Sequence, residues 1–68
     1  MSQAKRILQH LLTGRTITPR EAYEKYGTLA LHSRIAELRG QGVEIEMVMR
    51  QEGMTKWGEY SLKAVARG

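Results

Sequence analysis

Two short helical patterns meet at a single glycine in residues 18–42, TPREAYEKYGTLALHSRIAELRGQG. Thr18, Pro19 and Glu21 form a helix start signal, because Thr is a favoured N-cap, Pro fits the first helical position and Glu completes a capping box. Gly27 ends that helix, since glycine adopts the positive φ of a helix C-cap without strain. A second pattern follows directly. Helices joined so tightly cannot lie side by side along their whole length, so we expect them to cross at a steep angle.

Residues 28–39 are predicted to form the second helix of this pair, with Thr28 as its cap. Leu31, Ile35 and Leu38 fall within one narrow arc when each residue advances by about 100°. These three residues form the buried edge. Apart from Leu29, the rest of the helix carries small and polar side chains: Ala30, His32, Ser33, Ala36 and Glu37. A surface this smooth can approach another molecule closely.

An amphipathic helix is predicted over residues 3–13, ahead of this pair. Its apolar residues recur at i, i+3, i+4, i+7 and i+8, which is the spacing of one buried stripe: Ala4, Ile7, Leu8, Leu11 and Leu12. Gly14 ends this helix. Within it, His10 is expected to have a structural role. Tyr23 and Tyr26 of the following helix are expected in the core, with their hydroxyl groups at its edge.

The period changes to two residues after Gly42, which predicts a β-hairpin over residues 43–62. The first strand alternates from Val43 onward, and the second runs from about Lys56, with the glycine-containing loop QEGMT between them. Met47 and Met49 are then core residues, as are Tyr60 and Leu62. Trp57 is expected on the opposite face, and residues 63–68 form a tail.

A single α+β domain over residues 1–68, with three helices followed by a two-stranded hairpin, is the fold this order predicts. The chain has 68 residues and no cysteine, so the apolar core alone must stabilise it, without disulfides or thiolate metal sites. It also has no Asp and only two His, which leaves too few groups for the common catalytic triads or for a metal centre. We therefore expect no enzyme, metal or cofactor.

The chain resembles the small phage and prophage winged helix-turn-helix proteins. The resemblance runs through residues 7–62: an entry like GRTITPREAYEKYGT, a third helix like RIAELRGQG, and a hairpin that closes on YSL. The spacing of ITP, EA and YG, together with RIAELR, is its most specific part. The resemblance implies a winged helix-turn-helix fold and double-stranded DNA as partner. The function expected from it is a transcriptional regulator or an excisionase-like architectural factor.

In that motif the third helix enters the major groove, and the wing lies on the phosphate backbone. The predicted base contacts are Thr28, Ala30, His32, Ser33, Arg34 and Glu37. The predicted phosphate contacts are Arg15, Arg20, Lys25, Arg39, Arg50 and Lys56. One small module covers few base pairs, so we expect a homodimer or a cooperative array.

Each of these residues also has a structural explanation. Arg39 is favoured by the dipole at any helix C-terminus, Arg34 can pair with Glu37, and His32 can be simply solvated. Four glutamates in the hairpin region oppose DNA binding by the hairpin: Glu44, Glu46, Glu52 and Glu59. Trp57 either caps the edge of the core or marks an interface. The alternative hypothesis is therefore a module that docks a phage or host protein through Trp57 and Met54.

The formal net charge of +4 gives mild support to a polyanionic partner. Apolar residues near the N-terminus recur at helical spacing without forming a continuous run, which argues against a signal peptide. No stretch approaches the roughly 20 apolar residues of a membrane span. The expected location is the cytoplasm of a bacterial host cell.

Overall fold

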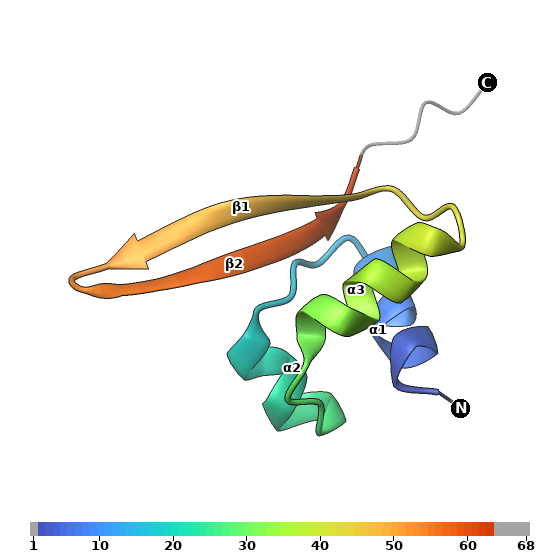
Figure 1. Cartoon of the computed structure of the whole chain (residues 1–68), viewed down its shortest axis with the longest axis horizontal. Coiled ribbons are helices and arrows are strands. Elements are labelled where there is room, and N and C mark those ends of the chain that lie inside the picture. Colours follow the sequence, from blue (N-terminus) through green and yellow to red (C-terminus); the bar gives the residue numbers. More distant parts are fainter. Residues whose placement is uncertain (1, 64–68) are drawn as a thin grey trace.

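The computed structural model describes residues 2–63 and shows three helices followed by an antiparallel hairpin (Figure 1). The helices are α1 (Gln3–Leu12), α2 (Pro19–Tyr26) and α3 (Leu31–Gly40), and the strands are β1 (Ile45–Glu52) and β2 (Thr55–Leu62). This arrangement confirms the predicted α+β fold class. All of the predicted tail except its first residue lies outside the described residues.

The predicted capping signals of α2 form at Thr18, Pro19 and Gly27, whereas the Glu21 carboxylate, predicted to complete a capping box, lies near Lys25 and His10. The Thr18 hydroxyl accepts a hydrogen bond from the Glu21 amide at 3.2 Å, and Pro19 occupies the first turn. Gly27 has φ 70° and its amide donates to the Tyr23 carbonyl at 2.9 Å, so the left-handed C-cap is realised. These local bonds fix where α2 ends.

Helix α3 begins at Leu31, three residues later than predicted. The prediction was wrong because it started a new helix directly after Gly27, whereas the chain needs residues 27–30 to turn. Within that turn the Thr28 amide bonds back to the Ala22 carbonyl at 3.5 Å, and the Thr28 hydroxyl accepts from the Ala30 amide at 3.3 Å. Thr28 therefore stabilises the turn, and the N-cap residue of α3 is Ala30, which makes no side-chain cap bond.

The hairpin is regular along its whole length. Its register runs from Ile45 opposite Leu62 to Glu52 opposite Thr55, which leaves a two-residue turn, Gly53-Met54. Gly53 has φ 60° while no described non-glycine residue has positive φ, as expected for a type II′ turn. At the other end Ile17 pairs with Tyr60 through two backbone hydrogen bonds of 2.8 Å, which ties the α1–α2 loop to β2.

A single core joins the helices to the root of the hairpin. Its buried members are Ala4, Ile7, Leu11, Ile17, Ala22, Leu31, Ile35, Leu38 and Ile45. Tyr26, Tyr60 and Leu62 pack against it, as predicted. Four other residues expected in the core are exposed: Leu12, Tyr23, Met47 and Met49. Leu12 is the last residue of α1, and Met47 and Met49 lie beyond Ile45, the one buried residue of β1.

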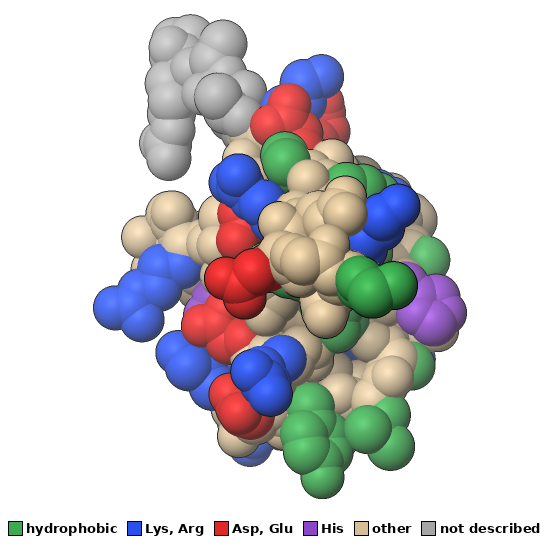
Figure 2. Space-filling model, turned by 90° about the vertical axis from the view of Figure 1, so that its left-hand side faces the viewer, with side chains coloured by type: hydrophobic (Ala, Val, Ile, Leu, Met, Phe, Trp, Pro, Cys, Tyr) green, Lys and Arg blue, Asp and Glu red, His purple; other side chains and the backbone are tan. Residues whose placement is uncertain are grey.

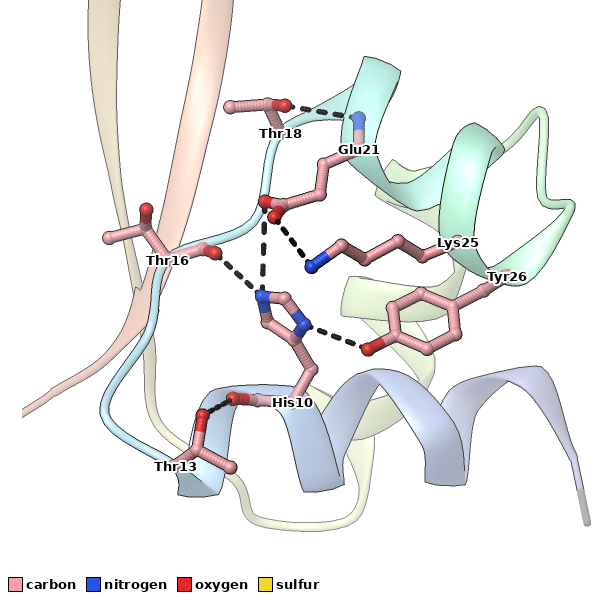
Figure 3. Close-up of polar contacts among 7 residues, drawn as sticks. All are labelled: His10, Thr13, Thr16, Thr18, Glu21, Lys25 and Tyr26. Carbon is pink, nitrogen blue, oxygen red and sulfur yellow. Dashed lines mark hydrogen bonds and ion pairs between the residues drawn. The ribbon is translucent and has the colours of Figure 1, made fainter.

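His10 links α1, α2 and the loop between them (Figure 3). Its side chain is buried, with Nε2 2.8 Å from the Thr16 carbonyl and Nδ1 2.8 Å from the Tyr26 hydroxyl. Because a carbonyl oxygen can only accept, Nε2 carries the proton, and in the neutral imidazole the Tyr26 hydroxyl donates to Nδ1. A Glu21 carboxylate oxygen lies 3.8 Å from Nε2. The predicted structural role of His10 is thus confirmed.

Candidate nucleic-acid interface

Helix α3 packs into the body through one edge and leaves the other free. Leu31, Ile35 and Leu38 are buried, as the sequence predicted. At about 100° per residue, the direction opposite this edge is occupied by small side chains. The residues nearest to it are Ser33, Ala36, Glu37 and Gly40, all exposed or half-buried. The outward surface of α3 therefore carries short side chains and one carboxylate, that of Glu37.

The predicted base-contact residues divide into three groups. His32 and Glu37 are exposed on α3, and Ser33 is half-buried near its outward centre. Ala30 is half-buried just before the first turn. Thr28 is only 5% exposed and its hydroxyl is used within the turn. The structure thus leaves Thr28 no free surface with which to contact a base.

Arg34 lies on the side of α3 and is held only loosely. Its Nη1 lies 3.8 Å from a Glu37 carboxylate oxygen, which is the i, i+3 pairing foreseen from the sequence. Its Nε is buried and has no hydrogen-bond partner among the described residues. Since Nε is buried, the donors of Arg34 that a ligand can reach are those on Nη1 and Nη2.

Three of the six predicted phosphate contacts have partners within the chain. Arg39 donates from Nη2 to the Ile45 carbonyl at 2.7 Å and so fixes the root of the hairpin to α3. Arg50 donates from Nε and Nη2 to one Glu59 oxygen at 3.1 and 3.0 Å. Lys25 lies 3.4 Å from Glu21. Among residues 2–63 no ion pair involves the other three, Arg15, Arg20 and Lys56.

Arg15 and Lys25 belong to a shallow hollow between α1 and α2, away from α3. Its volume is about 410 Å³, and its lining residues are Arg6, Gln9, His10, Thr13, Arg15, Lys25 and Tyr26. None of these comes from α3 or from the hairpin. The structure therefore separates these two cations from the surface that carries His32 and Ser33.

Arg20 lies instead at a cleft between the start of α2 and the hairpin. The cleft has a volume of about 760 Å³ and is lined by Thr18, Pro19, Arg20, Glu52, Thr55, Trp57 and Glu59. Trp57 pairs with Arg50, so it lies on the opposite face of the hairpin from Tyr60 and Leu62, as predicted. Met54, in the turn, is 99% exposed and is not part of this cleft.

Charges of both signs mix on the side of the molecule that the hairpin turn faces. Figure 2 shows Lys and Arg side chains interspersed with Glu, and hydrophobic side chains along the lower edge. The pairing of Arg50 with Glu59 is one cause of this mixing. On this face the cations are thus interspersed with carboxylates and do not form a continuous basic surface.

Sequence reasoning missed two residues at the centre of the outward surface, Ala36 and Gly40. Ala36 was placed on this side of the helix but was not included among the contacts, and Gly40 was assigned to the break after the helix. The structure includes Gly40 as the last residue of α3. A helical wheel centred on Leu31, Ile35 and Leu38 identifies both.

Residues 2–65 match the family described as winged helix-turn-helix domain. The chain belongs to this family. Winged helix-turn-helix domains are in general DNA-binding modules and are typically not enzymes, so DNA is the partner that the family indicates. Neither the comparison with curated proteins nor that with solved structures gives a significant match.

Two further features of the winged helix-turn-helix domain concern the described residues only. None of their helices is long and apolar enough to cross a membrane. Residues 2–63 also contain no group of three or more His, Cys, Asp or Glu side chains that is arranged to hold a metal ion.

Proposed function

We propose that this winged helix-turn-helix domain binds double-stranded DNA with the outward surface of α3 in the major groove. The observation that carries the proposal is the outward surface of α3, where Ser33, Ala36 and Gly40 have short side chains or none. The opposite edge of the helix is fixed in the core. The major groove accepts one α-helix, and small side chains let the helix backbone lie near the bases.

His32, Ser33 and Arg34 are the proposed hydrogen-bonding readers of base edges. Arg34 makes one long ion pair, with Glu37, and a guanidinium can bond to two acceptors of guanine, while Ser33 can donate or accept. Ala30 is proposed to contact a thymine methyl and Glu37 a cytosine amino group. Thr28 is left out of this set because its side chain is buried.

Arg20 and Lys56 are the proposed phosphate contacts at the wing. Arg20 lines the cleft beside the hairpin, and Lys56 lies in β2. Neither has an ion-pair partner among residues 2–63, so both charges can serve a phosphate. Arg39 and Arg50 can contribute through the donors that their internal bonds leave free. Arg15 and Lys25 lie at the α1–α2 hollow and are proposed to act only at longer range. Release of counterions from the phosphates then makes binding weaken steeply with salt.

The biological role proposed is that of a phage-type transcriptional regulator or an excisionase-like architectural factor in the cytoplasm of a bacterial host. The resemblance of ITP, EA, YG and RIAELR to small phage and prophage proteins supports it. One module of this size covers few base pairs, so binding as a homodimer or as an array on repeated half-sites is part of the proposal.

A protein-docking module is the second candidate, and the cleft at Trp57 is the observation that favours it. A half-buried tryptophan beside Pro19 offers an apolar contact with a charged rim, as interaction hot spots often do. A phage or host protein is then the partner, with the exposed Met54 as a further contact.

The test is a salt titration of binding to mixed-sequence duplex DNA, followed by selection from a random duplex library at physiological salt. We expect affinity that falls steeply with salt and a short enriched motif. Ala36→Glu adds a carboxylate at the centre of the α3 surface and should weaken binding at least about tenfold. Gln9→Glu makes the same change of charge on exposed α1 and is the matched control.

Equal binding by the two variants would contradict the placement of α3 in the groove. No binding at low salt by a folded wild-type chain would overturn DNA binding altogether. Capture of a protein partner that Trp57→Ala abolishes and Ala36→Glu does not would then favour the docking module.

A further inference from the structure

The outer edge of β1 is unpaired in this chain. Among the described residues the sheet has only β1 and β2, and its one additional bridge joins Ile17 to β2. In Figure 1, β1 forms the margin of the sheet on the side away from α1 and α2. An eight-residue strand therefore presents a free backbone edge.

The hydrogen-bond pattern identifies the residues that point outward from this edge. The Lys63 amide donates to the Glu44 carbonyl, and hydrogen-bonded pairs alternate along an antiparallel ladder. Residues 46, 48, 50 and 52 therefore bond to β2, while residues 45, 47, 49 and 51 point away. Arg39 covers the Ile45 carbonyl, so the accessible part begins at Met47.

This edge has neither a proline nor a bulge to prevent pairing with another strand. The charged residues of the segment IEMVMRQE, Glu46, Arg50 and Glu52, are of both signs, so they can pair with a strand of complementary charge. Its three consecutive apolar residues are well exposed: Met47 at 45%, Val48 at 47% and Met49 at 58%. Exposed apolar side chains along a free edge favour the addition of a further strand.

The sequence of the edge is complementary to itself when two copies run antiparallel. With Val48 opposite Val48 of a second copy, Glu46 lies opposite Arg50 on both sides of the centre, and Met47 lies opposite Met49. We propose that β1 pairs in this register with β1 of a second copy, which gives a homodimer with one continuous four-stranded sheet. Opposite charges and apolar pairs facing each other across strands each stabilise a sheet.

Arg50 can take part in this pairing without leaving Glu59. It uses Nε and Nη2 on the Glu59 carboxylate, which leaves the Nη1 donors for Glu46 of the second copy. Residues 46, 48, 50 and 59 lie on the same face of the hairpin, so the guanidinium lies between the two carboxylates. The intramolecular ion pair thus orients Arg50 for the dimer contact.

The neighbouring registers are less favourable. Sliding β1 toward its root places Met47 opposite Met47, so both hydrogen-bonded pairs beside the centre need the Ile45 carbonyl that Arg39 occupies. Sliding it toward the turn places Met49 opposite Met49 and replaces both Glu46–Arg50 pairs by Glu46 opposite Glu52. In the proposed register the two central pairs of Met47 with Met49 need no group of Ile45, and the like charges that face each other, Glu44 and Glu52, lie at the outer ends of the pairing.

Cysteine crosslinking tests the register, because the chain has no native cysteine. Val48 faces its own copy as a non-hydrogen-bonded pair, in which the Cα atoms lie about 4.5 Å apart, within disulfide range. Val48→Cys should therefore form a disulfide dimer under mild oxidation at least about tenfold faster than the control Met54→Cys, at the exposed turn. Equal rates, or faster crosslinking of Met47→Cys or Met49→Cys, would overturn the proposed register.

Sedimentation of the full chain without DNA tests the dimer itself. We expect the wild type to dimerise reversibly with concentration and Glu46→Arg, which puts two arginines opposite each other, to dimerise about tenfold more weakly. Mixing Glu46→Arg with Arg50→Glu should restore association as a heterodimer. A wild type that stays monomeric up to millimolar concentration would overturn the proposal. Since no DNA is present, this result is independent of whether α3 binds DNA.

Discussion

The helical body, residues 3–40, and the outer hairpin, residues 48–59, use their side chains in opposite ways. Every helix of the body contributes buried residues to one core, and Ile7, Leu11 and Ile35 are almost completely enclosed. No residue of the outer hairpin is buried. Its regular pairing continues well beyond the last contact with the core (Figure 1).

This difference shows that the buried core of a very small chain is confined to the helices, the α1–α2 loop and the root of the hairpin. The body holds α3 rigidly through Leu31, Ile35 and Leu38, which leaves the outward surface of α3 free to vary. The outer hairpin relies on backbone pairing and on Arg50 with Glu59. The exposed side chains of the outer hairpin are therefore free to contact a partner, either a phosphate backbone or a second copy of the chain.

The largest effect is expected from truncating the core of the body. Ile35→Ala should lower the free energy of unfolding by about 2–5 kcal/mol, because it leaves a cavity that rigid helices cannot fill. Met49→Ala on the outer hairpin should change it by less than about 0.5 kcal/mol in dilute solution. Urea unfolding followed by circular dichroism measures both, and similar losses would refute the division between body and hairpin.

A smaller loss is expected at the polar contact that ties α1 to α2. His10→Ala should cost about 1–3 kcal/mol, since it leaves the Thr16 carbonyl and the Tyr26 hydroxyl without their partner. Tyr26→Phe removes only one of the two hydrogen bonds and should cost about 1 kcal/mol. The urea midpoints of the two variants give the ranking, and a milder effect of His10→Ala than of Tyr26→Phe would contradict it.

Two glycines with positive φ sharpen the comparison. Gly27 (φ 70°) joins α2 to α3 and Gly53 (φ 60°) forms the hairpin turn, and an added Cβ would meet no atom within 4 Å at either. Alanine should therefore introduce backbone strain at both, at least as large at Gly53 as at the left-handed Gly27, where it is about 1–2 kcal/mol. Gly27→Ala should lower global stability by this amount. Gly53→Ala should lower it less, because the outer hairpin can open while the body stays folded.

Amide hydrogen exchange distinguishes these two cases directly. Gly53→Ala should accelerate exchange in residues 48–59 and leave α1 protected, whereas Gly27→Ala should accelerate exchange throughout the body. Equal acceleration of α1 by both variants would show that body and hairpin unfold as one unit.

The smallest effect is expected at the exposed ion pair of the hairpin. Arg50→Gln removes a pair whose arginine side chain is 55% exposed, so it should cost about 0.5 kcal/mol or less in dilute solution. The difference from wild type should vanish at high salt. Thermal unfolding at two salt concentrations measures it, and a large salt-independent loss would assign this pair a structural role that its exposure does not suggest.

Much of the fold follows from local signals in the sequence. Thr18, Pro19 and Gly27 bracket α2 because each makes its cap within a few residues of itself. The period of two residues likewise indicates the hairpin, although its turn is Gly53-Met54 and not the five-residue loop QEGMT predicted from the sequence. These features could be predicted because neighbouring residues alone decide them.

The parts of the fold and of the candidate site that the sequence did not predict depend on contacts between distant residues. Thr28 follows a glycine in the manner of a helix cap, but the hydrogen bond from its amide to the Ala22 carbonyl draws it into the turn. Met47 and Met49 follow the two-residue alternation expected of core residues. They are exposed because β1 is buried only at Ile45 and extends beyond the core. The internal partners of Arg39 and Arg50 depend on where the hairpin folds relative to α3, which residue spacing does not encode.

The most direct test of the central claim is a titration of the isotopically labelled chain with a short mixed-sequence DNA duplex at low salt, followed by NMR. The account predicts that the largest shift changes fall on Ser33, Ala36 and Glu37 of α3, with smaller changes near Arg20 and Lys56 and little change at Gln9. Changes centred on the α1–α2 hollow or on the cleft at Trp57, with α3 unaffected, would contradict it.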